Sequence, residues 1–382
     1  MPIEPTPFRQ EFPLQEGLIY LNHAGVAPVP RRSLRIMTEV ANHMARYGAS
    51  RYRELDALHE GARQRCAQLL DVSARQIALV PNTSEGLSFV GLGVAWHSGD
   101  EIVTTDQEFP SNIVIWLDLA RRHGLTVHQV PSGVDGRVDA LALLERVNAR
   151  TRIVAVSSVQ FGTGAVVDLL QLGAALRSTS TLLVVDGIQS LGILPLHPAS
   201  VGIDALCADG HKWLLGPEGC GLLYLSEKGL DQIQPRVVGW HSVANAGDYQ
   251  HICIDPRDDC RRFEAGSPNI LGTAALGESI GLLLEVGIET VRARVHQLVS
   301  SLTTGLRDLG CVIHTPLGTD GFPGAGIVVF SHPDMETATL HRELLARNIY
   351  HAHRGAGVRF SPHFYQDATD VTLALRGVAE VL

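Results

Sequence analysis

The chain has 382 residues, of which 45% are hydrophobic and 19% are charged, and its formal net charge is −9. This composition is typical of a globular protein, and the length suggests two or three domains, or one large domain with an appendage. The acidic balance argues against nucleic acid and anionic membranes as partners. No stretch approaches twenty uninterrupted apolar residues, and the N-terminal residues lack the pattern of a secretory signal.

The cysteines show neither the spacing of a zinc site nor that of a redox pair. They are typical of reduced, mostly buried thiols, so we expect a cytoplasmic protein. The six are Cys66, Cys207, Cys220, Cys253, Cys260 and Cys311.

Helical and strand-like stretches alternate between about residues 50 and 225. Short apolar runs joined by helical stretches of ten or more residues predict βαβ units and a mostly parallel sheet. Because these strands are apolar throughout, we expect helices on both faces. The expected strands are 76–80, 101–105, 126–130, 152–158, 181–186, 203–209 and 220–225, and the expected helices between them are 54–70, 84–96, 112–124, 139–149 and 168–178.

The pattern changes after residues 263–269. A long helical stretch is expected over about 271–309, interrupted near Gly287. Strand-like pieces at 311–315, 324–331 and 349–353, a helix at 335–348 and a C-terminal helix then indicate an α+β unit. We therefore expect an N-terminal segment, 1–20, that could pack on either part, a large α/β domain, 21–270, and a smaller α+β C-terminal domain, 271–382.

Ligands of open parallel sheets bind beyond the carboxyl ends of the strands, and polar residues follow several of these strands. Thr83 and Ser84 come directly after one strand and open a helix, where free N–H groups and the helix dipole attract anions. Simple N-capping by either residue would explain them as well.

Asp186 ends the most apolar strand, and Gln189 follows three residues later. A carboxylate there is costly unless a positive group meets it. A helix cap or a partner for a nearby basic side chain is the ordinary alternative.

Lys212 follows the next strand, in "DGHKWLLGPEGCG", between apolar runs. Lysines in apolar sites have lowered pKa values and become amines that can form Schiff bases. A surface lysine at a strand end is the alternative. Phe109 lies after the strand at 101–105, where core packing is the ordinary explanation.

Together these residues match the needs of one cofactor, pyridoxal 5'-phosphate. The anion site would bind the phosphate, the carboxylate would pair with the pyridine nitrogen, and the amide would donate to the phenolic oxygen. The aromatic side chain would stack on the ring, and the lysine would react with the aldehyde.

The chain resembles the class V aminotransferases, a branch of the fold-type-I pyridoxal-phosphate enzymes that includes cysteine desulfurases, kynureninases and isopenicillin-epimerase-like proteins. The similarity extends over nearly the whole chain, from "YLNHAGVAPVP" to "GVRFSPHFYQDATDV". The motifs that carry it are "PNTSEGLSFV", "DGIQSLG", "DGHKWLLGPEGCGLLYL", "FEAGSPN" and "GVRFSPH".

The resemblance implies a role for each matching residue. Lys212 would hold the cofactor as a Schiff base and later move a proton at the substrate Cα, while Asp186 would pair with the pyridinium nitrogen. Arg359 would clamp a substrate carboxylate with its planar guanidinium. The other implied contacts are Thr83, Ser84 and His211 to phosphate, Gln189 to the phenolic oxygen, Phe109 to the ring face, Ser267 to the phosphate of a neighbouring subunit in a homodimer, and Asn22 and His23 on the substrate side.

Departures from the family pattern narrow the expected activity. "FPSN", which begins at Phe109, and "GWHSV", residues 239–243, resemble kynureninases, and no cysteine lies in residues 349–359, where desulfurases carry one. We therefore expect cleavage at Cβ of an amino-acid-like substrate, by a C–S lyase or a kynureninase-like enzyme, and doubt a persulfide mechanism. An aminotransferase or epimerase of the same family is the alternative. A non-catalytic cofactor-binding relative is the alternative of another class, against which Lys212 and Asp186 both argue.

His351 and His353 would share one face of a strand, which superficially fits a metal pair. With no acidic or cysteine partner nearby in sequence, we expect no metal site there, and expect these histidines to line the site or to pack.

Overall fold

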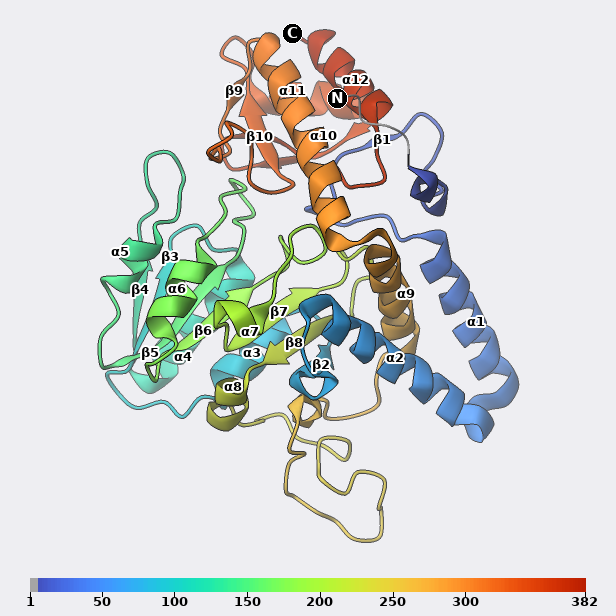
Figure 1. Cartoon of the computed structure of the whole chain (residues 1–382), viewed down its shortest axis with the longest axis vertical. Coiled ribbons are helices and arrows are strands. Elements are labelled where there is room, and N and C mark those ends of the chain that lie inside the picture. Colours follow the sequence, from blue (N-terminus) through green and yellow to red (C-terminus); the bar gives the residue numbers. More distant parts are fainter. Residues whose placement is uncertain (1–5) are drawn as a thin grey trace.

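The computed structural model describes residues 6–382, and a seven-stranded sheet forms the centre of its larger part (Figure 1). Its strand order is β2-β8-β7-β6-β5-β3-β4. All neighbouring pairs are parallel except the two that involve β8. The strands are β2 (Ile77–Val80), β3 (Glu101–Thr105), β4 (Thr126–Val130), β5 (Thr151–Ser157), β6 (Leu182–Asp186), β7 (Ala205–Asp209) and β8 (Gly221–Leu225).

Apolar cores cover both faces of this sheet. Along β5, Val154 and Val156 belong to one buried cluster, whereas Ile153 and Ala155 belong to another. This alternation explains why the inner strands are apolar at nearly every position. Only β4, at the edge, is largely accessible. The helices around the sheet are α3 (Thr83–Gly93), α4 (Val114–His123), α5 (Ala140–Leu144), α6 (Leu169–Leu176), α7 (Pro198–Val201) and α8 (Glu227–Gln232).

Two long helices link the large and small parts. The helix α9 (Ile270–Val286) packs on α1 (Arg31–Tyr47) and α2 (Tyr52–Leu70), and α10 (Ile288–Asp308) continues into the small part (Figure 1). Gly287, with φ +83°, separates α9 from α10, as the interruption in the sequence predicts. Among the described residues, no helix alone is long and apolar enough to cross a membrane. Only α9 and α10 taken together have the required length and composition, and they are bent by 82°.

The small part contains an antiparallel sheet of order β12-β13-β10-β9, with helices α11 (Thr337–Ala346) and α12 (Ala368–Ala379). Its strands are β9 (Val312–Ile313), β10 (Val328–Ser331), β12 (Ala352–Arg354) and β13 (Gly357–Phe360). The expected strand 349–353 is divided, because β11 (Ile349–Tyr350) pairs with β1 (Ile19–Tyr20) instead.

The described part of the N-terminal segment packs on the small part. The 3₁₀-helix η1 (Pro7–Glu11) places Arg9 against Asp370, and Phe12 stacks on Tyr365 with ring centroids 3.7 Å apart. The fold class expected from the sequence is confirmed, with a mostly parallel sheet and a smaller α+β part. The domain boundaries at residues 20 and 270 stay predictions.

Candidate active site

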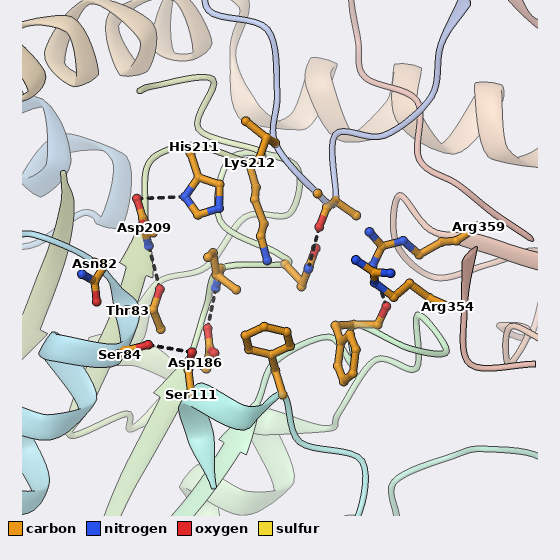
Figure 2. Close-up of a pocket in the computed structure, with 17 residues that line it drawn as sticks. Asn82, Thr83, Ser84, Ser111, Asp186, Asp209, His211, Lys212, Arg354 and Arg359 are labelled. Atoms are coloured by element: carbon orange, nitrogen blue, oxygen red, sulfur yellow. Dashed lines mark hydrogen bonds and ion pairs between the residues drawn. The ribbon is translucent and has the colours of Figure 1, made fainter. Parts of the chain in front are cut away.

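A pocket of about 380 Å³ lies where the carboxyl ends of β2, β6 and β7 meet the hairpin of the small part (Figure 2). Because β2, β3, β6 and β7 all run in one direction, the residues that follow them gather at one edge of the sheet. The sequence-predicted residues that line this pocket are Thr83, Ser84, Phe109, Asp186, Gln189, His211, Lys212 and Arg359.

Lys212 is held in the loop after β7, where it is only 9% exposed. Burial lowers the pKa of its amine to about 8, although the nearby Asp186 carboxylate acts in the opposite direction. Its Nζ lies 5.5 Å from the ring centroid of Phe109. The pocket thus holds an amine that is partly neutral near physiological pH and faces an aromatic ring.

Asp186 ends β6 at the pocket floor and is 1% exposed. Its Oδ1 accepts a hydrogen bond from the Ile188 N–H at 2.9 Å, and burial raises the pKa of the carboxyl to about 7. Nearby, Gln189 is fixed in place, because its Oε1 accepts from the Trp213 indole at 2.9 Å and its Nε2 donates to the Ala24 carbonyl at 3.1 Å.

Hydroxyl groups and free N–H groups gather at the start of α3. Asn82, rather than Thr83 or Ser84, caps the helix, since its Oδ1 accepts from the Glu85 N–H at 2.9 Å. The Ser84 hydroxyl lies 2.7 Å from that of Ser111, while the Thr83 oxygen accepts from the Asp209 N–H at 2.9 Å. The hydroxyls of Thr83 and Ser84 therefore do not cap the helix.

His211 adds a side chain to the same corner of the pocket. Its Nδ1 lies 3.1 Å from the Asp209 carboxylate, within ion-pair distance (Figure 2). Together with the N-terminus of α3, this group of hydroxyls and an imidazole suits an anion such as a phosphate.

Glu108 fixes the turn that carries Phe109. It is 8% exposed and accepts hydrogen bonds from the Ser157 N–H and hydroxyl and from the side-chain amides of Gln160 and Asn112. Among residues 6–382, no cation lies within ion-pair distance of this carboxylate. Burial raises its pKa. The Phe109 ring packs edge-on against Phe161, with centroids 5.0 Å apart.

Arg359, on β13, is the buried cation on the other side of the pocket. Its Nη1 donates to the Phe161 carbonyl at 2.8 Å, its Nη2 approaches Asn22 Oδ1 at 3.5 Å, and its Nε has no partner among the described residues. Burial lowers the pKa of the guanidinium to about 9. A buried guanidinium without a carboxylate partner suits an anionic ligand.

Two residues expected on the substrate side lie elsewhere or act indirectly. His23 is fully buried, with its ring nitrogens 2.8 Å from the Ser361 carbonyl and 2.8 Å from the Tyr365 hydroxyl, and it does not line the pocket. Its position is that of a packing residue. Asn22 is also absent from the pocket wall and reaches the site only through Arg359.

Ser267 lies outside this pocket. It lines a separate depression together with Gly219, Glu264 and Gly266. His351 is buried and paired with His341, their nitrogens 2.8 Å apart, and His353 is exposed. No group of three or more His, Cys, Asp or Glu side chains among the described residues is arranged to hold a metal ion.

Sequence reasoning missed Ser111, Phe161 and Arg354, which also line the pocket. Ser111 belongs to the "FPSN" motif, and its place beside an expected anion site was the only available signal. Arg354 follows the two histidines of "HAHR", and nothing in that motif distinguishes it from a surface arginine.

These side chains fit pyridoxal phosphate. A buried carboxylate with a raised pKa, a buried amine with a lowered pKa, an aromatic ring and an anion cradle surround one cavity. The carboxylate suits the cofactor's ring nitrogen, and the amine suits its aldehyde. The aromatic ring suits the face of the cofactor ring, and the anion site suits its phosphate.

Comparisons with known proteins agree with this geometry. The family model described as aminotransferase class-V matches residues 19–372. A probable cysteine desulfurase of Pyrococcus abyssi is 29% identical over 99% of this chain and 97% of its own length. The isopenicillin N epimerase of Streptomyces clavuligerus is 27% identical over 94% of this chain and 93% of its own length.

Solved structures give the same result. A mutant of C-DES with glycine covalently linked to the PLP cofactor matches with a TM-score of 0.91 and 27% identity, over 98% of this chain and 100% of that one. The complex of the cystine C–S lyase C-DES with its reaction product cysteine persulfide matches with a TM-score of 0.88 and 27% identity, over 96% and 98%.

The expected cofactor is confirmed, whereas the doubt about desulfurase activity gains no support from relatives that include a probable cysteine desulfurase. The match over residues 19–372, together with the arrangement of the pocket, shows that this chain is a pyridoxal-phosphate enzyme that belongs to the class-V aminotransferase family.

Proposed function

We propose that this enzyme is a C–S lyase, which cleaves the Cβ–S bond of a cysteine-derived amino acid without the help of a protein thiol. The products are pyruvate, ammonia and a thiol, or a persulfide when the substrate is a disulfide. The similarity to the cystine C–S lyase C-DES supports this choice over other reactions of the family.

The observation that carries the proposal is the absence of a thiol at the pocket. Between Ile349 and Arg359 the chain forms β11 and the tight hairpin of β12 and β13, which contains no cysteine. No residue that lines the pocket is a cysteine. Five cysteines are buried elsewhere, and burial raises the pKa of Cys66 to about 12 and that of Cys311 to about 11. Thiols of this kind are poor nucleophiles.

Each side chain then has a role in the reaction. Pyridoxal phosphate, when bound, supplies an electron sink for the electrons left at Cα. Arg359 holds the substrate carboxylate, and Asn22 orients Arg359. The Lys212 amine holds the cofactor covalently and moves the proton at Cα. Asp186 keeps the ring nitrogen protonated. The remaining contacts are Thr83, Ser84 and His211 to the phosphate, Gln189 to the phenolic oxygen and Phe109 to the ring face.

Ser267 fits this scheme only in a homodimer. Since it lies outside the pocket of its own chain, we assign it to the phosphate of the partner subunit's site. Two copies would then share residues at both active sites.

A cysteine desulfurase is the second candidate, favoured by the similarity to the Pyrococcus abyssi protein. It would need Cys253, the only cysteine that is not buried, which lies in an irregular loop. The isopenicillin N epimerase relative keeps an epimerase or aminotransferase as a further alternative. Kynureninase-like cleavage stays a prediction.

Products distinguish these candidates. The wild-type enzyme incubated with L-cystine or L-cysteine should release pyruvate and ammonia in equal amounts and no alanine. A variant with all six cysteines replaced by serine or alanine, and the single variant Cys253→Ser, should do the same. The cofactor-loaded Lys212→Ala variant, which lacks the proton-moving amine, serves as the inactive control.

Alanine as the main product, lost in Cys253→Ser, would reject the lyase and establish a desulfurase. A keto acid that keeps the Cβ–S bond, or racemised substrate, would point to the other reactions of the family.

A further inference from the structure

Arg354 lines the pocket, but the proposed reaction gives it no role. The backbone that carries it is held in place by the hairpin. Arg354 ends β12 and pairs across the hairpin with Gly357. Gly355, with φ +56°, makes the turn, and a Cβ added there would lie 2.9 Å from the Gly162 carbonyl oxygen. The hairpin tip is therefore held close to the segment that carries Phe161, which is part of the pocket wall.

The guanidinium of Arg354 has no anionic partner among the residues that the structure describes. Within residues 6–382, its only hydrogen bond goes to the carbonyl of the adjacent His353, at 2.8 Å, and no carboxylate lies within ion-pair distance. Several exposed arginines of this chain have such a partner within a turn of helix, as Arg121 does with Asp118. Arg354 is thus an unpaired cation at a cavity wall.

Arg354 and Arg359 reach the pocket from the same side (Figure 2). The charge of Arg354 contributes to lowering the pKa of both Arg359 and Lys212. Two cations this close repel each other, and an anionic ligand relieves that repulsion. The carboxylates of the pocket do not neutralise these two cations. Asp209 lies beside His211, and Asp186 accepts a hydrogen bond from the Ile188 N–H.

We propose that Arg354 forms a second anion subsite at the pocket wall, so that the preferred substrate carries a carboxylate at the end distal to Cα. The inference rests on the proposed C–S lyase function. Arg359 takes the carboxylate at Cα, and Arg354, which is exposed, takes the group beyond the sulfur atom. The substrate class is therefore a thioether or disulfide amino acid with a distal carboxylate.

Two substrates of nearly equal shape test this subsite. S-carboxymethyl-L-cysteine and S-carbamoylmethyl-L-cysteine differ by one negative charge at the distal end. The measured quantity is the ratio of their kcat/KM values, followed by thiol and pyruvate release. In Arg354→Gln this ratio should fall by about tenfold, the scale of one charged contact at a partly enclosed site. Differences in leaving-group chemistry cancel, because both enzymes act on the same pair.

Control variants separate the subsite from general charge effects. Arg342→Gln removes the same charge from a side chain that is 68% exposed and lies outside the pocket wall, and should leave the ratio unchanged. Arg354→Lys keeps the charge without the planar fork and should recover part of the ratio. Thermal unfolding of each variant verifies that it is folded.

Binding provides a readout that does not require turnover. Calorimetric affinities of both compounds for cofactor-loaded Lys212→Ala, with and without Arg354→Gln, should show the same preference and the same loss. If the preference for the carboxylate is equal with Arg354 and with Gln, the subsite is refuted. If binding depends on Arg354 but no S-substituted cysteine yields thiol and pyruvate in the wild type, the subsite stands and the lyase reaction is rejected.

Discussion

Asp186 and Lys212 are buried at one edge of the sheet, and burial shifts the pKa of each toward its neutral form, to about 7 and about 8. Neither side chain forms an ion pair in the described residues. Such groups cost the fold free energy until a ligand meets them. The cofactor, which brings a positive ring nitrogen and an aldehyde, is the ligand that removes both costs.

Replacing Asp186 by asparagine should therefore stabilise the cofactor-free protein while damaging the enzyme. The pKa of this carboxyl in the folded protein, about 7, exceeds its ordinary value of 3.8, so the folded state loses stability as pH rises from about 4 to about 7. In urea unfolding, Asp186→Asn should gain about 2–4 kcal/mol at about pH 8 and much less at about pH 5. With saturating cofactor, turnover should fall by about two orders of magnitude or more.

The control for this prediction is Asp118→Asn, which replaces a carboxylate on α4 that is 24% exposed, pairs with Arg121 and lies outside the pocket. It should show neither the gain near pH 8 nor the loss of turnover. A gain in Asp186→Asn that is equal at both pH values, or unchanged turnover, would mean that Asp186 is only a local structural residue.

The site residues that the sequence predicts best are those that follow strands. Lys212, Asp186 and Thr83 each come just after, or at the end of, an apolar run, so their shared location follows from the direction of parallel strands. Arg354 and Glu108 were missed for a different reason. Their positions depend on a hairpin and on a turn whose contacts, with residues 157–162, are distant in sequence.

At the scale of elements, the turn from Glu108 to the 3₁₀-helix η4 (Pro110–Asn112) joins β3, β5 and α4 around one carboxylate. Asn112 donates to Glu108 at 2.8 Å and accepts from the Trp116 indole at 3.1 Å. The orientation of the Asn112 amide is thereby fixed, and so is the turn that presents Phe109 and Ser111 to the pocket.

Moving the carboxylate from position 108 to position 112, and the amide from 112 to 108, should preserve the hydrogen bonds between Glu108, Asn112 and Trp116. Glu108→Gln alone places two amide donors against each other, and should lower the free energy of unfolding by about 1–3 kcal/mol. Adding Asn112→Asp lets the new amide donate to a carboxylate that still accepts from Trp116. The double variant should recover most of the loss, measured by urea unfolding in a double-mutant cycle.

Losses that simply add in the double variant would contradict this account of the turn. Cofactor absorption gives a second readout, because a displaced Phe109 ring should change the spectrum in Glu108→Gln and not in the double variant.

Elements with a local signal were predicted well, and elements defined by distant pairing were not. Gly287 predicted the break between α9 and α10. The run 349–353 was expected to be one strand, but its first two residues pair with β1, more than three hundred residues away in sequence. The two-residue strand β1 has no pattern of its own to reveal that pairing.

At the scale of the whole molecule, an irregular loop between α8 and the 3₁₀-helix η5 (Cys260–Phe263) exposes large apolar side chains. It projects from the end of the molecule opposite the small part (Figure 1). Tyr249, Ile252 and Ile254 are 74%, 91% and 89% exposed. Exposed apolar groups this close together mark an association surface. The loop is also tied to the segment before Ser267, since the His241 N–H donates to the Ala265 carbonyl at 3.2 Å.

We therefore expect this loop and Ser267 to meet the partner subunit together. The chain of 41.2 kDa should sediment as a dimer of about 82 kDa, twice that mass. The double variant Ile252→Glu and Ile254→Glu places charges in that interface and should raise the dimer dissociation constant by about a hundredfold or more. Cofactor affinity should fall in parallel, because each site would lose the Ser267 of its partner. Val134→Glu, at a still more exposed apolar residue of another loop, should change neither property. A wild-type monomer that binds cofactor fully at micromolar concentration would remove Ser267 from the site and leave the pocket complete within one chain.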